Sequence, residues 1–178
     1  IVAIFLGFVL FWWVLHDLLT SGPSSFSLNW ITVGDTTITW GVVVDRLSVV
    51  MLGLVTFVAF LVQVYSIGYM KGQARYGWYF AAHALFAAAM LALVLADNLL
   101  FLYMGWELVG LGSYLLIGFW YERRSAAEAA KKAFVTTRIG DVGLLIGIIL
   151  LFRATGTFEI STIFHVAQQG GVRQATLN

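Results

Sequence analysis

Three charged side chains lie inside long apolar stretches of this sequence, where a charge is costly. Glu107 stands near the middle of the run from Asp97 to Tyr121, and Arg138 and Asp141 lie within a later run. At about 1.5 Å per residue, Glu107 is about 14 Å from the start of its run, well inside a hydrocarbon layer about 30 Å thick. An acid at that depth must be neutral, paired with a cation or in contact with water. Each of these states bears on proton movement, so Glu107 is the first candidate for a proton-carrying group.

Arg138 and Asp141 are three residues apart, which places them on one helix face and predicts an ion pair between them. Counted from Ala133, Asp141 lies about 12 Å along its span, whereas Glu107 lies about 21 Å from the same membrane side. The gap of about 9 Å is too long for a direct hydrogen bond, so we expect water or another polar group to couple the two acids. A structural alternative stands beside this interpretation, because buried charges can also simply fix the packing of helices.

His83, near the beginning of another apolar run, is a weaker candidate for a proton relay. The ordinary pKa of histidine suits proton exchange near neutral pH, but a histidine near a helix end is more often an interface residue. Small residues should let the helices that carry the charges approach one another. Gly105 and Gly112 flank Glu107, and Gly143 and Gly147 have the small-xxx-small spacing.

The composition as a whole predicts a membrane protein. Of the 178 residues, 61% are hydrophobic and only 11% are charged, and the mean hydropathy is +0.91, which is far from the composition of a soluble domain. The net charge is +1 and the ten Lys and Arg residues are scattered, which argues against a nucleic-acid partner. No cysteine is present. Any iron–sulfur cluster held by thiolates must therefore lie on another chain.

The fold class predicted is an all-α transmembrane protein with five membrane-spanning helices and one surface β-hairpin. The predicted spans are 1–20, 47–69, 79–96, 99–121 and 134–152. Residues 26–44 alternate with period two around a turn at Gly34 and Asp35, and such a hairpin cannot cross lipid alone. We expect a short surface helix or loop over 122–132 and a polar loop over 153–178. Because an apolar run begins at Ile1, we also expect a piece of a longer protein that lacks the first helix and everything after the fifth span.

Alternation of the five spans places the basic residues on one side of the membrane. Lys71, Arg75 and the stretch from Arg123 to Lys132 fall in two loops on the same side. Cytoplasmic loops carry an excess of Lys and Arg, so we expect these loops to be cytoplasmic and the hairpin to face outward. The predicted location is the cell inner (plasma) membrane, with multiple passes.

Two long stretches carry a specific resemblance. LADNLLFLYMGWELVGLGSYLLIGFWY (Leu95 to Tyr121) and KAFVTTRIGDVGL (Lys132 to Leu144) resemble subunit L, or chain 5, of proton-pumping NADH:quinone oxidoreductase, respiratory complex I. The similarity continues in DRLSVVML from Asp45, YMKG from Tyr69 and GTFEI from Gly156. It covers most of the chain from Asp45 to about Ile160.

The resemblance implies part of an antiporter-like helix bundle in the membrane arm of that enzyme. The subunit translocates protons and has no cofactor or redox catalysis of its own, because NADH, FMN, iron–sulfur clusters and quinone bind partner subunits. The other membrane-arm subunits, especially a neighbouring antiporter-like subunit, and the lipid bilayer are the implied partners. In the family the acid matching Glu107 pairs with a lysine on a later helix, and Arg138 and Asp141 match residues tied to the same charged network.

The predicted spans contain no lysine, so this chain alone is not expected to pump. The mechanism needs a cation that moves, because an acid beside a cation releases its proton more readily than the same acid left alone. Three alternatives remain open on the sequence. They are a subunit of a multi-subunit Na⁺/H⁺ antiporter, a subunit of an ion-translocating hydrogenase and a passive membrane scaffold.

Overall fold

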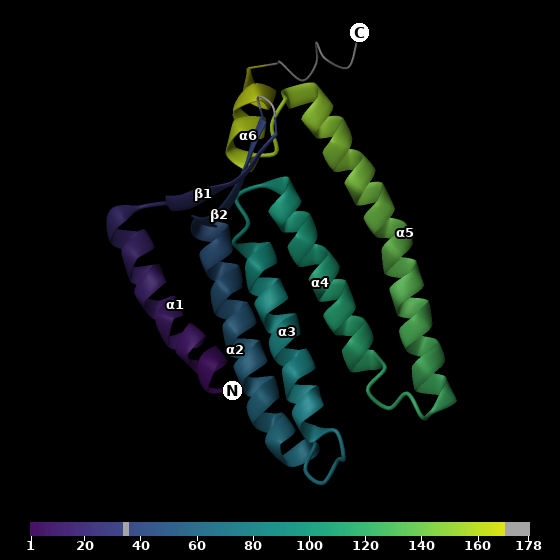
Figure 1. Cartoon of the computed structure of the whole chain (residues 1–178). Coiled ribbons are helices and arrows are strands. Elements are labelled where there is room, and N and C mark those ends of the chain that lie inside the picture. The colour runs from purple at the N-terminus through teal and green to yellow at the C-terminus, as the bar shows by residue number, and fades with distance from the viewer. Residues whose placement is uncertain (34–35, 170–178) are drawn as a thin grey trace.

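The computed structural model describes residues 1–33 and 36–169 and confirms the predicted fold class (Figure 1). Its elements are α1 (Val2–Ser21), β1 (Ser24–Val33), β2 (Thr36–Val44), α2 (Arg46–Tyr69), α3 (Tyr76–Val94), α4 (Leu99–Ile117), α5 (Arg124–Thr155) and α6 (Ile160–Gln168). The helices α1 to α5 are long and apolar enough to cross a membrane, and β1 and β2 pair as an antiparallel hairpin. The turn predicted at Gly34 and Asp35 lies outside the described residues. The chain is an integral membrane protein.

The helices stand side by side, and consecutive ones run in opposite directions (Figure 1). Small residues set the closest approaches between them: a Cβ added to Gly53 of α2 would lie 2.7 Å from the Phe11 ring of α1. Many large apolar side chains remain exposed on the outer faces of α1 and α2. In a bilayer such faces meet lipid, so they need no further protein cover.

Polar side chains cap the beginnings of α2 and α4. Asp45 and Ser48 form a reciprocal capping box at the start of α2, with both nitrogen–oxygen distances at 2.7 Å. Asn98 caps α4 by accepting a hydrogen bond from the Phe101 backbone N–H at 2.8 Å. These side chains satisfy amide groups that have no partner within the helix.

Main-chain hydrogen bonds join the hairpin to two helix turns at one end of the bundle. The N–H of Val43 donates to Leu95 (2.9 Å), that of Leu99 to Phe158 (2.9 Å) and that of Ile160 to Asp97 (3.1 Å). Asn98, which is buried, also donates to the Thr39 carbonyl at 2.5 Å. The α3–α4 turn is therefore held from the hairpin and from the α5–α6 turn, and this fixes the beginning of α4.

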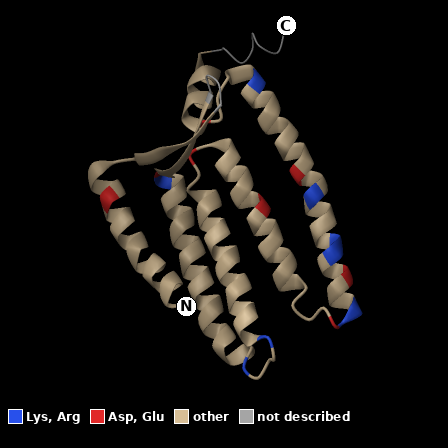
Figure 2. Ribbon diagram, viewed as in Figure 1, with Lys and Arg blue, Asp and Glu red and all other residues tan. Residues whose placement is uncertain are grey.

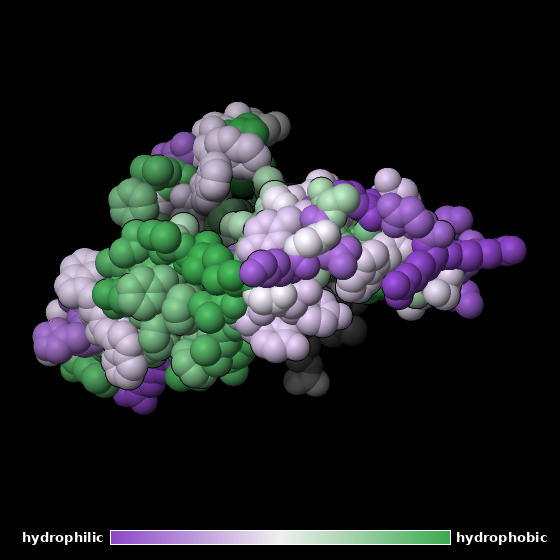
Figure 3. Space-filling model, turned by 90° about the horizontal axis from the view of Figure 1, so that it is seen from below, coloured by the Kyte–Doolittle hydropathy of each residue, from purple (hydrophilic) through white to green (hydrophobic). Residues whose placement is uncertain are grey.

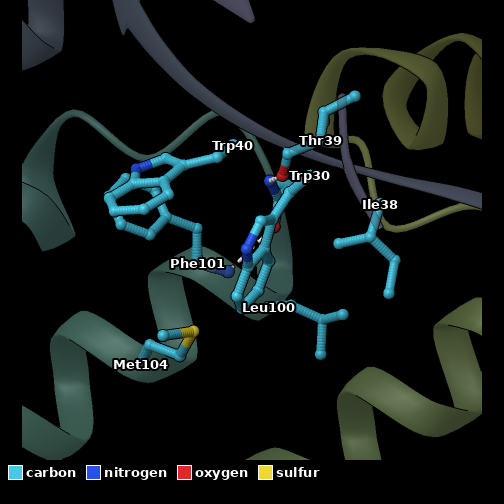
Figure 4. A pocket seen from close by; sticks show the side chains of 8 residues that line it. Trp30, Ile38, Thr39, Trp40, Leu100, Phe101 and Met104 are labelled. Carbon is cyan, nitrogen blue, oxygen red and sulfur yellow. Dashed lines mark hydrogen bonds between the residues drawn. The ribbon is translucent and has the colours of Figure 1, made fainter. Parts of the chain in front are cut away.

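An apolar pocket lies where the hairpin meets α4 (Figure 4). Trp30 and Trp40 come from the two strands, and Phe101 and Met104 from the first turns of α4. The ring centroids of Trp40 and Phe101 are 5.4 Å apart, a typical aromatic contact. The pocket lining is aromatic and aliphatic apart from Thr39 and Asn98, so its role is to seat the hairpin on α4.

Two predicted boundaries are wrong. Helix α5 begins at Arg124, ten residues before the predicted span at 134, and the charged stretch 122–132 forms its first turns instead of a separate surface element. This stretch is rich in alanine and contains neither proline nor glycine, so nothing ends the helix. The predicted loop over 153–178 is also partly helical. Helix α5 continues to Thr155, where Gly156 ends it with a positive φ of 73°, and α6 follows.

Charged residues gather mainly at the helix ends, whereas α4 and α5 also carry charge at mid-height (Figure 2). The end with the α2–α3 and α4–α5 turns is hydrophilic over these turns and the beginning of α5 (Figure 3). There Arg75 donates to both carboxylate oxygens of Glu122 at 2.8 Å and to the Phe119 carbonyl at 2.6 Å. This arginine links the two turns that the sequence places on the same membrane side.

Candidate functional site, a charged contact between α4 and α5

Helix α4 presents two different faces. Gly105 and Gly112, seven residues apart, lie directly against α3, because a Cβ on either would come within about 3.0 Å of Leu93 or Phe86. This confirms that small residues let α3 and α4 approach. Glu107 is two residues, or about 200°, from Gly105 around the helix. The acid therefore points away from α3 and toward α5.

Arg138 of α5 forms an ion pair with Glu107 of α4. The same Nη1 atom of Arg138 lies 3.7 Å from Oδ2 of Asp141, one turn along α5. The ion pair expected between Arg138 and Asp141 is therefore present. The arginine stands between the two acids and carries one positive charge for two carboxylates.

Trp106 completes the network. Its indole N–H donates to Oδ1 of Asp141 at 2.7 Å, across the contact between α4 and α5. Asp141 is thus held by a cation on its own helix and by a donor on the neighbouring helix. Two consecutive residues of α4 therefore contact α5. Trp106 contacts Asp141, and Glu107 contacts Arg138.

The three charged side chains differ in burial. The side chain of Asp141 is 6% exposed, that of Glu107 is 22% exposed and that of Arg138 is 35% exposed. A charge that is buried and doubly partnered is costly to move, whereas a partly exposed one can exchange partners more easily. Glu107 and Arg138 are therefore the members of the network with room to change, and Asp141 is the fixed anchor.

The polar group expected between Glu107 and Asp141 is Arg138, which pairs with Glu107 and lies 3.7 Å from Asp141. The arginine itself joins the two acids, and no added group is needed for that contact. The cation beside Glu107 is thus supplied by this chain.

Two members of the site were missed by sequence reasoning. The Trp106 indole N–H needs an acceptor inside a membrane, which was a usable signal for a polar partner nearby. Phe134 lies under the guanidinium of Arg138, with 4.5 Å from the Cζ atom to the ring centroid. Its position one turn before Arg138 would have allowed that contact to be anticipated.

His83 does not join this network in the structure. It is buried between α2 and α3, where its Nδ1 lies 3.2 Å from Nε2 of Gln63. Gly143 and Gly147 also differ from expectation, because a Cβ added to either would meet no atom within 4 Å among the described residues. Within this part of the chain they do not bring helices together, since they lie away from the helix face that meets α4.

The described residues contain no group of three or more His, Asp or Glu side chains placed to hold a metal ion. The site chemistry visible here consists of carboxylates, one guanidinium and one indole N–H. Such a set can hold a proton and shift it between partners.

Comparison with known proteins identifies the class. A family model described as NADH:quinone oxidoreductase/Mrp antiporter matches residues 96–177, and one described as the N-terminus of chain 5 of NADH–ubiquinone oxidoreductase, complex I, matches residues 30–80. The chain belongs to this family of antiporter-like membrane subunits. The first matched region contains the entire charged contact.

Individual relatives point to the chain 5, or subunit L, type within the family. The chain is 51% identical over 144 residues to NAD(P)H-quinone oxidoreductase chain 5 of Synechocystis, covering 80% of this chain and 21% of that protein. It is 46% identical over 162 residues to NADH-quinone oxidoreductase subunit L of Pseudomonas aeruginosa, covering 88% and 26%. The chain thus spans about a fifth to a quarter of the length of these relatives.

A solved structure shares the fold. The Mrp complex from Dietzia matches with a TM-score of 0.74 and 26% identity, over 88% of this chain and 18% of the matched chain. Complex I subunits and an Mrp subunit are therefore both among the proteins that this chain is similar to.

Proposed function

We propose that this chain is part of a proton-translocating, antiporter-like subunit in the membrane arm of an NADH:quinone oxidoreductase. The observation that carries the proposal is the contact in which Arg138 pairs with Glu107 and lies beside Asp141, inside membrane-length helices. The similarity to chain 5 and subunit L of two bacteria supports this assignment. Redox chemistry, with its NADH, flavin, iron–sulfur clusters and quinone, belongs to partner subunits in this proposal.

The proposed mechanism is an exchange of partners by Arg138. When the guanidinium lies against Glu107, that acid keeps its negative charge, because an adjacent cation favours the ionised form. When Arg138 moves fully to Asp141, Glu107 loses its partner in a low-dielectric setting and takes up a proton. Return of Arg138 releases that proton. A cation from another part of the assembly, such as a lysine on a later helix, drives the exchange by competing for the acids.

The distribution of basic residues supports an orientation of the chain in the membrane. The turns that carry Lys71, Arg75 and Arg123 are on one side, together with the first turns of α5 up to Lys132. We propose that this side is cytoplasmic and that the hairpin faces outward, because cytoplasmic loops are enriched in Lys and Arg. The membrane is then the cell inner (plasma) membrane, and the other membrane-arm subunits are the partners.

Replacement of Glu107 with Gln in the complete enzyme tests the proposal. The amide keeps the size of the side chain but cannot bind and release a proton, so proton pumping driven by NADH oxidation should fall strongly. Glu122→Gln is the matched control, because Glu122 is an exposed acid at the helix end that pairs with Arg75. Unchanged pumping in the Glu107 variant would remove this acid from the mechanism.

A subunit of a Na⁺/H⁺ antiporter is the second candidate, favoured by the similarity to the Mrp complex from Dietzia. Copurification distinguishes the two. Flavin and iron–sulfur subunits in the purified complex support the oxidoreductase, and a complex of membrane subunits alone supports the antiporter. An ion-translocating hydrogenase would copurify with redox subunits but lack NADH oxidation. A passive scaffold would tolerate neutral residues at 107, 138 and 141 without loss of ion movement.

A further inference from the structure

A pair of aromatic side chains lies beside the charged contact between α4 and α5. Phe134 is one turn before Arg138 on α5, and the Cζ atom of Arg138 is 4.5 Å from the centroid of the Phe134 ring. Tyr114 of α4 packs against the same ring, with 5.1 Å between the ring centroids. Asp141 lies one turn after Arg138. The guanidinium therefore has an aromatic ring toward one end of α5 and a carboxylate toward the other.

Helical spacing explains why these side chains meet. Tyr114 is seven residues, or about two turns, after Glu107, so both lie on one face of α4. Phe134 and Arg138 are four residues apart and share a face of α5. The contacts run in sequence from Tyr114 to Phe134, from Phe134 to Arg138 and from Arg138 to Glu107. The Phe134 ring is thus held from α4 by Tyr114 while it contacts the cation of its own helix.

The guanidinium pairs with the less buried of the two acids. Its partner Glu107 has a side chain that is 22% exposed, whereas Asp141, at 3.7 Å, is 6% exposed. Opposite charges attract more strongly where water is excluded, so Coulomb attraction alone would favour Asp141. Two contacts act against that preference. Trp106 already donates to Asp141, and the negative face of the Phe134 ring attracts the cation.

We propose that Phe134 is a positioning residue that keeps the Arg138 guanidinium beside Glu107 and so sets how the arginine is shared between Glu107 and Asp141. This inference rests on the proposed function, because it concerns the same exchange of partners. Phe134 and Asp141 are seven residues apart, or about 10.5 Å along α5. A guanidinium that approaches Asp141 to the usual distance of about 2.8 Å moves away from the ring. The ring therefore opposes the step in which Glu107 loses its partner.

The ring contact is strong enough to bias the arginine and weak enough to be overcome. Cation–π contacts correspond to a factor of about 2 to 30 between two positions of a cation, and the larger values belong to desolvated sites. The Arg138 side chain is 35% exposed, so its contact falls inside this range. A bias of that size keeps the arginine in its resting position. A second cation that binds the acids more strongly in one arrangement than in the other can still shift it.

The test compares Phe134→Leu with Phe134→Tyr in the complete, assembled complex. Leucine keeps an apolar side chain but removes the aromatic face, whereas tyrosine keeps that face. Phe152→Leu is the control, because Phe152 is another partly buried phenylalanine of α5, and its ring stacks on the Phe158 ring with 4.2 Å between centroids. The readouts are the amount of assembled complex, the protons pumped per electron and, at one fixed pH, the infrared carbonyl band of protonated Glu107. The band is identified by its absence from the Glu107→Gln variant.

In the resting complex, we expect Phe134→Leu to raise the ratio of protonated to ionised Glu107 by about 2-fold to 30-fold, because the guanidinium lies beside this acid less often. Pumping per electron should fall in the same variant. Phe134→Tyr and Phe152→Leu should keep the band and the pumping of the unaltered complex. An unchanged band in Phe134→Leu, or an equal change in Phe134→Tyr, would overturn the proposal.

These results are separable from the test of the proposed function. If Glu107→Gln abolishes pumping while Phe134→Leu changes neither the band nor pumping, Phe134 has no positioning role and the proposed function stands. If Glu107→Gln pumps normally while Phe134→Leu changes the band, the proposed function fails and the positioning role stands.

A high-resolution structure of the unaltered complex decides the question where a variant does not assemble. We expect the guanidinium to lie over the Phe134 ring whenever it pairs with Glu107. An arginine that pairs with Glu107 away from the ring would overturn the proposal.

Discussion

Helix α4 makes two contacts that differ in kind. Against α3 it uses glycine, and the two helices approach so closely that a single added carbon atom would clash. Against α5 it uses Trp106 and Glu107, which reach Asp141 and Arg138 through polar contacts. The first contact leaves no room for movement, since packed interfaces resist added volume. In the proposed mechanism the second contact is rearranged by exchanging partners, so α4 serves as the fixed platform and α5 carries the movable cation.

Gly105→Leu is expected to have the largest effect, because it disrupts the close contact between α3 and α4. A Cβ at this position would lie 2.9 Å from the backbone nitrogen of Leu93, which cannot move aside as a flexible side chain can. Overpacking of this kind costs about 1–3 kcal/mol and occasionally more. We expect a strong loss of assembled complex and a lower thermal midpoint in detergent. Gly143→Leu is the matched control, since a Cβ there meets no atom within 4 Å in the described residues. An equal loss in both variants would mean that close packing on α3 is not the reason for glycine at 105.

Trp106→Phe should weaken the polar contact between α4 and α5 without adding side-chain volume. This change removes the N–H that Asp141 accepts at 2.7 Å and leaves a buried carboxylate oxygen without its donor. Hydrogen bonds to charged groups contribute about 1.5–3 kcal/mol. We expect Asp141 to compete more strongly for Arg138, and proton pumping to fall while assembly is largely kept. Trp120→Phe is the comparison, because its indole lies at the exposed helix end, 3.5 Å from Gln73. Pumping that falls equally in both variants would argue against a specific role for Trp106.

The smallest effect is expected at the surface pair of Arg75 and Glu122. The carboxylate side chain is 61% exposed, and exposed ion pairs contribute about 0–1 kcal/mol. Glu122→Gln should shift the thermal midpoint slightly, and the shift should shrink further in high salt because screening weakens the pair. Pumping should be unchanged. A large salt-dependent loss of stability would show that this pair locks the two turns together.

Much of the fold was predictable because membrane spans follow from hydropathy alone. The five helices, the hairpin and the closely packed Gly105 and Gly112 were all expected from pattern and spacing. The course of α5 was not, because charged residues in its first turns resemble a surface loop when only hydropathy is considered. The stretch expected as a separate surface element is therefore the first part of α5.

The candidate site was predictable in its members but not in its pairing. Depth in an apolar run identified Glu107, and three-residue spacing identified the Arg138–Asp141 contact. Which acid the guanidinium reaches across helices depends on their tilt and register, and neither is encoded in spacing along one helix. Trp106 was missed because an indole in a membrane helix is usually read as a lipid-interface residue. The Gln63–His83 contact needed the facing register of α2 and α3.

The most direct measurement of the central claim is infrared difference spectroscopy of the complete complex during turnover. If Glu107 takes up and releases a proton, the carbonyl stretch of a protonated carboxylic acid should appear and disappear with turnover, and this signal should be absent in the Glu107→Gln variant. An identical spectrum from both proteins, or pumping that continues in the variant, would contradict the account.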